Sequence, residues 1–84
     1  MLEKKVTIGN TSTSLLDENL NRLDVSVTNP TDEEIRLAYG PEATMSGEEV
    51  VIGPNGYHRV SGGYTGPLSA ICAAGEKEIK VIEV

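Results

Sequence analysis

The chain has 84 residues, and its 13 acidic side chains outnumber its seven basic ones, which gives a formal net charge of −6. This balance disfavours nucleic acid as a partner, because such binding depends on Lys and Arg displacing counterions from the phosphates, and it equally disfavours a membrane surface. No stretch approaches the roughly 20 apolar residues of a spanning helix, and residues 1–5 lack the following apolar run of an export signal. We therefore expect one soluble, unexported domain over residues 1–84, with no nucleic-acid or membrane partner.

The composition predicts a thin core. The chain has three Tyr but no Phe or Trp, so the large areas that aromatic side chains usually bury are missing. A single cysteine, Cys72, allows no disulfide within the chain. Small domains that lack disulfides and a large core are commonly stabilised by oligomerisation or by docking on a partner, and we expect the same here.

The first 22 residues are polar and irregular apart from two apolar pairs. Val6 and Ile8 alternate with polar residues and indicate a first strand. Leu15 and Leu16 lie between polar tracts, either in a single helical turn or in an extended arm, and we favour the arm. The two leucines of such an arm would fill pockets on a neighbouring subunit; alternatively, both fold back onto the core of their own chain.

A period-two pattern begins at Leu23, and Leu23, Val25 and Val27 are expected to share the buried face of one strand. The pattern resumes at residues 35–39, after a polar turn at residues 29–32. Two alternating runs joined by a short polar turn predict an antiparallel hairpin.

Four further strands are predicted, at residues 50–52, 57–60, 68–74 and 78–84. Ile71, at the centre of the third of these, is expected in the core. Strands about ten residues apart, with no helical stretch between them, predict an all-β fold. We expect a small antiparallel β-sandwich or barrel with an extended N-terminal arm, in which residues 1–22 form the arm and residues 23–84 the core.

No constellation of side chains predicts a reaction. His58 is the only histidine, and neither candidate nucleophile, Ser61 or Cys72, has a catalytic signature around it. The acidic run at residues 32–34 lacks the spacing of calcium ligands, and the glycine-rich turns do not precede a helix, as phosphate-binding loops do. We expect no catalytic residue, cofactor or metal ligand, and a small hydrolase using His58 is the weakest alternative.

An ordered set of short motifs carries a family resemblance. Its most specific part is the run Gly66-Pro67-Leu68-Ser69-Ala70-Ile71, which leads to a glycine and then to a final strand with an acid near its end. The other elements are Leu15-Leu16, Asn19, Arg22, the strand ending in Asn29, residues 35–40, the Pro54-Asn55-Gly56 turn and residues 81–84. Over residues 13–84 this order resembles small β-sandwich virion proteins of tailed bacteriophages.

The resemblance implies a non-enzymatic capsid decoration or cement subunit that lies on the virion exterior after assembly in the host cytoplasm. Such a subunit is expected to form a homo-oligomer, a trimer, and to bind the major capsid protein or another virion protein. The alternative is a tail or fibre-base adaptor that presents its loops to a protein or a glycan. We expect Leu15, Leu16, Met45 and Tyr64 at the interface, with Tyr64 placed to stack on a sugar.

Overall fold

The computed structural model describes residues 2–45, 50–60, 64–73 and 75–84. These residues form eight strands and no helix. The strands are β1 (Leu2–Ile8), β2 (Thr13–Leu16), β3 (Val25–Thr28), β4 (Ile35–Ala38), β5 (Val50–Ile52), β6 (Tyr57–Val60), β7 (Leu68–Cys72) and β8 (Lys77–Glu83).

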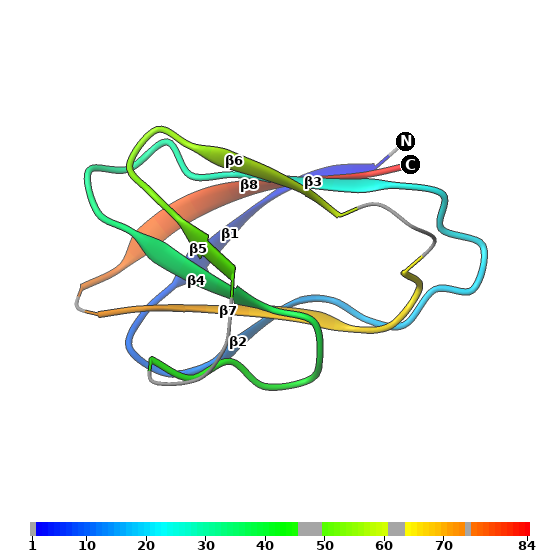
Figure 1. Ribbon diagram of the computed structural model, residues 1–84, viewed down its shortest axis with the longest axis horizontal. Coiled ribbons are helices and arrows are strands. Elements are labelled where there is room, and N and C mark those ends of the chain that lie inside the picture. Colours follow the sequence, from blue (N-terminus) through cyan, green and yellow to red (C-terminus); the bar gives the residue numbers. More distant parts are fainter. Residues whose placement is uncertain (1, 46–49, 61–63, 74) are drawn as a thin grey trace.

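The strands build two four-stranded antiparallel sheets that face each other (Figure 1). Sheet A has the order β1-β8-β3-β6, and sheet B has the order β2-β7-β4-β5. This arrangement confirms the predicted all-β fold as a small antiparallel sandwich. Of the seven connections between these strands, only the one from β4 to β5 joins neighbouring strands of the same sheet, and the other six cross from one sheet to the other.

The core lies between the sheets and consists of aliphatic side chains. Val27 of β3 lies opposite Val81 of β8, and both are buried, as the period-two pattern requires. They face the buried side chains of sheet B, among them Leu37 and Leu68. Cys72 is also fully buried in this cluster, where it acts as a small apolar residue.

The middle strand β7 is buried on both of its faces. Ile71 points away from the inter-sheet core and packs with Ala38, Ala43 and the half-buried Met45 in a second cluster. The segment at residues 39–45 covers this outer side of sheet B. It is held there by Ser69 Oγ, which donates to the carbonyl oxygen of Gly40 at 3.0 Å. Ile71 is 5% exposed, so its predicted burial is confirmed.

The hairpin predicted from residues 23–39 is wrong, because β3 and β4 belong to different sheets. The connection between them turns on Asn29, whose side chain is fully buried. Its amide nitrogen lies 2.7 Å from the carbonyl oxygen of Glu33, 3.1 Å from that of Ile52 and 3.0 Å from that of Gly53. Asn29 therefore holds the β3-to-β4 connection against the β5-to-β6 connection, and both cross between the sheets. The hairpin prediction was wrong because two strands in facing sheets show the same alternation of apolar and polar residues as two strands of one hairpin.

The turn predicted at residues 53–56 is confirmed. The amide of Gly56 donates to the carbonyl oxygen of Gly53 at 3.0 Å, and Asn55 has a φ of 60°. A proline followed by a residue with positive φ is the pattern of a type II turn. This turn carries the chain from β5 in sheet B to β6 in sheet A.

The N-terminal segment is not an arm in the part that the structure describes. β1 is an edge strand of sheet A and β2 is an edge strand of sheet B. Leu15 is 0% and Leu16 is 5% exposed, and both belong to the inter-sheet core. Neighbouring residues of a regular strand point to opposite faces, but the pairing register of β2 shifts between Ser14 and Leu16, and this irregularity accompanies the burial of both leucines.

Candidate interaction surface

One end of the sandwich carries both chain termini and the connection from β2 to β3, residues 17–24, which lies at the tip of the molecule (Figure 1). We call it the loop end. The β6-to-β7 connection, described from residue 64, also reaches it, because antiparallel strands place these connections at the same end.

The loop end is organised by a buried arginine. The side chain of Arg22 is 0% exposed, and its Nε donates to Oε2 of Glu83 in β8 at 2.7 Å. Its two Nη atoms donate to the carbonyl oxygens of Gly66 and Asp17, each at 2.7 Å. One guanidinium group thus joins β8 to two separate connections, and its planar fork of donors suits this role.

The same network lowers the pKa of the Glu83 carboxyl group. The hydrogen bond from Arg22 is the largest of the influences that hold the pKa of Glu83 below its ordinary value, and burial opposes it. The side chain of Asn19 adds a longer hydrogen bond to the same oxygen at 3.4 Å, and the charge of Lys4 acts in the same direction. Glu83 is therefore an ionised group that fixes the end of β8 to residues 17–24.

The backbone of residues 17–24 is also fixed. The amide of Asn19 donates to the carbonyl oxygen of Thr65 at 2.8 Å, and the amide of Arg22 donates to that of Asn19 at 3.1 Å. The second bond closes a turn with Leu20 and Asn21 at its centre. The segment is thus held to the sandwich at several points along its length.

This fixed segment presents leucines to solvent. Leu20 is 75% exposed and Leu23 is 77% exposed. The amide of Leu23 donates to the carbonyl oxygen of Val84 at 2.7 Å, which brings the exposed Val84 beside it, and exposed Leu2 begins the neighbouring strand β1. We call Leu2, Leu20, Leu23 and Val84 the terminal apolar surface. These four are among seven exposed large hydrophobic residues in the described ranges, so such side chains concentrate at this end.

The expected inward position of Leu23 is wrong. The strand begins only at Val25, and Asp24 Oδ1 accepts a hydrogen bond from the Val25 amide at 2.9 Å. Leu23 precedes this point and lies beyond the end of the buried face.

A second group of residues joins the two sheets near the β6 edge. His58 lies opposite the buried Val27, which directs its ring toward sheet B. There its Nε2 lies 2.8 Å from the hydroxyl of Tyr39, whose ring centre is 5.0 Å from that of Tyr64. Burial, followed by the influence of Tyr64, raises the pKa of the Tyr39 hydroxyl.

The candidate reactive residues are not brought together. His58 contacts Tyr39, whereas the thiol of Cys72 lies 3.8 Å from the carbonyl oxygen of Ile8 inside the core. Ser61 lies outside the described residues. The contact between His58 and Tyr39 therefore links the two sheets.

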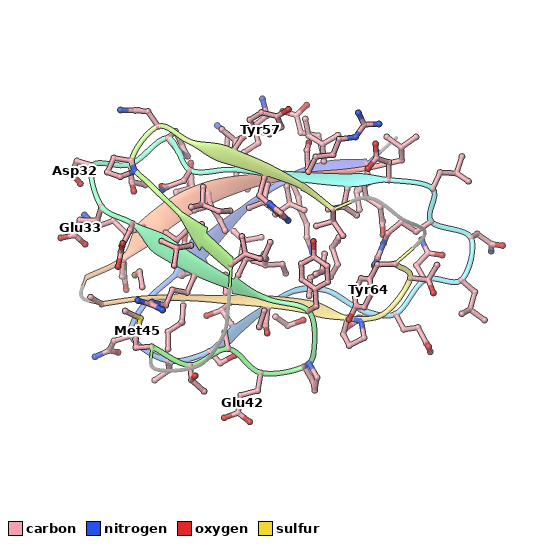
Figure 2. All side chains as sticks on the ribbon, in the orientation of Figure 1. Asp32, Glu33, Glu42, Met45, Tyr57 and Tyr64 are labelled. Carbon is pink, nitrogen blue, oxygen red and sulfur yellow. The ribbon has the colours of Figure 1, made fainter. Side chains whose placement is uncertain are left out.

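The four predicted interface residues do not form one surface. Leu15 and Leu16 are in the core. Met45 packs over the outer side of sheet B, while Tyr64 lies toward the loop end (Figure 2). Tyr64 is only partly exposed, donates to the carbonyl oxygen of Pro67 at 2.7 Å and packs on Tyr39, so its ring is not a free platform for a sugar.

Sequence patterns did not indicate the exposure of Leu20 and Leu23 or the role of the buried Arg22 in holding their segment. One signal was present, because the run Asn19-Leu20-Asn21 places a leucine where neither a strand nor a helix pattern buries it. No local sequence pattern identifies the partner of Arg22, because Glu83 lies 61 residues further along the chain.

The sheet edges carry features that oppose pairing with another strand. β1 has Lys4 on its inner side and Lys5 on its outer side, and β2 has the register shift. The other two edge strands, β5 and β6, have only three and four residues. Charged side chains, irregularities and short length all discourage association through a strand edge. This leaves the loop end as the better candidate for a contact.

The acidic run at residues 32–34 lies at the opposite end of the sandwich, where Figure 2 labels Asp32 and Glu33. Lys77 Nζ lies 3.3 Å from Asp32 Oδ1, and this hydrogen bond lowers the pKa of Asp32 and raises that of Lys77. Within the described ranges, no group of three or more His, Cys, Asp or Glu side chains is arranged to hold a metal ion. The same ranges contain no helix of the length and apolarity needed to span a bilayer.

Comparisons with known proteins give no relative for this chain. No protein-family model, no curated protein and no solved structure matches it.

Proposed function

We propose that this protein is a non-enzymatic structural subunit that acts by associating with other protein chains. The observation that carries the proposal is the terminal apolar surface, where Leu20 and Leu23 are more than 70% exposed on a segment that Arg22 holds in place. Ordering a flexible segment costs free energy on binding, and a segment that is already fixed avoids much of that cost. Exposed leucines on a fixed segment are thus suited to a specific contact.

The more specific proposal is a capsid decoration or cement subunit of a tailed bacteriophage, which oligomerises and binds the major capsid protein on the virion exterior. Its support is the sequence resemblance together with the sandwich fold. The alternative is a tail or fibre-base adaptor, which the concentration of connections at one end also favours, because binding residues are commonly carried on loops of a rigid scaffold.

The test adds purified protein to capsids of the encoding phage that lack it, and measures how much sediments with the particles. We expect binding by the wild type and a large loss for Leu20→Ser/Leu23→Ser. Val51→Ser is the matched control, because Val51 is 47% exposed but lies on β5, away from the loop end. Failure of the wild type to bind would contradict the capsid role, and binding to purified tails alone would favour the adaptor.

A further inference from the structure

We propose that the loop end docks into an apolar hollow of another protein whose rim carries Lys and Arg, an inference that rests on the proposed assembly function and names the chemistry of the partner. The terminal apolar surface is the part that enters the hollow. Leu20 lies at the centre of its turn, and residues 17–24 lie at the tip of the molecule (Figure 1). A protruding apolar tip packs closely against a concave surface, and burying its leucines removes apolar area from water.

The exposed charges that flank these leucines are acidic. Asp17 and Glu18 lead into the turn, and both are exposed. No ion pair joins either carboxylate to a basic group of the described chain. The one basic residue of the segment, Arg22, is buried. The leucines therefore lie beside negative charge and beside no exposed cation of their own segment.

The other acids of this end are balanced within the chain. Three of them have a basic partner, in the pairs Glu83–Arg22, Asp24–Arg59 and Glu3–Lys80. Lys4 also acts on Glu83 from β1 and offsets part of the negative charge there. Asp17 and Glu18 are therefore the charges that this end leaves for a partner.

The charge of the whole chain acts in the same direction. The formal net charge of −6 attracts basic surfaces and repels acidic ones, which steers association toward a basic partner. Contact between the loop ends of two copies would bring Asp17 and Glu18 of each copy toward the same acids of the other, and like charges disfavour such a contact. A basic rim pairs with these two acids instead and fixes the orientation of the docked tip.

The test of this chemistry uses a short synthetic peptide of Lys and Leu, which carries both basic and apolar groups, and follows the amide spectrum of the labelled full chain by two-dimensional NMR. We expect shifts at Leu2, residues 17–24 and Val84. A peptide of Glu and Leu and a peptide of Lys and Ser should each bind at least about tenfold more weakly, because the first has the wrong charge and the second lacks apolar groups. Salt should weaken binding of the Lys and Leu peptide by screening the charges.

Variants of the chain locate the contact. Asp17→Asn/Glu18→Gln should weaken binding of the Lys and Leu peptide by about three- to tenfold, since exposed ion pairs contribute modestly. The leucine double variant used with the capsids should weaken it by at least about tenfold. The matched control is Glu76→Gln/Glu78→Gln, which changes the net charge equally at the opposite end of the sandwich, where both acids are exposed and have no ion pair in the described chain. Circular dichroism on every variant separates loss of binding from loss of fold.

Several outcomes would overturn the proposal: no binding of the Lys and Leu peptide, equal binding of the Glu and Leu peptide, shifts centred on the acidic end near Asp32, or an equal loss in the Glu76→Gln/Glu78→Gln control. Shifts at the loop end on concentrating the protein without peptide would show a second copy there and would also overturn it. The capsid assay keeps the two proposals apart. Capsid binding that is insensitive to salt and to Asp17→Asn/Glu18→Gln would overturn this inference alone, whereas peptide binding at the loop end of a protein that ignores capsids would contradict only the capsid role.

Discussion

The buried Arg22 network predicts a large and specific loss of stability when its guanidinium is removed. Arg22→Met keeps an apolar stem of similar length but leaves Glu83 without its 2.7 Å partner and the carbonyl oxygens of Asp17 and Gly66 without a donor. Breaking one partner of a buried ion pair typically costs about 3–5 kcal/mol. Folded domains are stabilised by about 0.05–0.15 kcal/mol per residue, which for 84 residues gives roughly 4–13 kcal/mol in total. The variant should therefore lose about a quarter of its stability or more.

Urea denaturation followed by circular dichroism measures this loss. The control is Arg59→Met, because Arg59 also bonds a carboxylate, Asp24, at 2.7 Å, but its side chain is 66% exposed. Exposed ion pairs contribute little, so the control should unfold nearly as the wild type does. Adding Glu83→Leu to Arg22→Met should recover part of the loss, since no charge is then left unpaired. Equal stability of Arg22→Met and Arg59→Met would refute the assignment of Arg22 as the organiser of the loop end.

Three further predictions concern the scaffold. Ile71→Ala should cost about 2–5 kcal/mol in urea denaturation, and a midpoint equal to that of the wild type would show that the outer cluster contributes nothing. Asn29→Ala should cost more than about 2 kcal/mol, because it removes the donor of several buried hydrogen bonds; the same measurement on Asn10→Ala, an exposed residue of the β1-to-β2 connection, should show a much smaller loss. The lowered pKa of Glu83 adds stability that is present above its ordinary pKa of 4.5 and is lost as the pH falls through the lowered value. Glu83→Gln should remove that part of the acid dependence, and an unchanged profile would contradict the ion pair.

Much of the fold could be predicted from the sequence, because alternation of apolar and polar residues reports local geometry. The strands at residues 50–52, 57–60 and 77–83 were found within a residue or so, and the turn between the first two was correct. Pairing could not be found in the same way. The alternation around Val27 fixes which side chains face inward, but it does not distinguish a neighbour in the same sheet from a strand in the opposite one.

The terminal apolar surface could not be predicted from the sequence, because it depends on contacts between residues far apart in the chain. Leu15 and Leu16 look like an isolated apolar pair in the sequence, and their burial appears only with the irregular pairing of β2 with β7. The exposure of Leu20 and Leu23 follows from the position of Arg22, whose partner is supplied by the last strand. Long-range hydrogen bonds of this kind decide which apolar residues remain on the surface.

If the protein acts by associating with other chains through its loop end, binding should shield that end from solvent, and hydrogen–deuterium exchange of the free protein and of the protein bound to capsids measures this directly. We expect exchange to slow on binding at Leu2, residues 17–24 and Val84, with β4 and β5 unchanged. Slowed exchange centred on β4, β5 or the acidic end near Asp32, with the loop end unchanged, would contradict this role of the loop end.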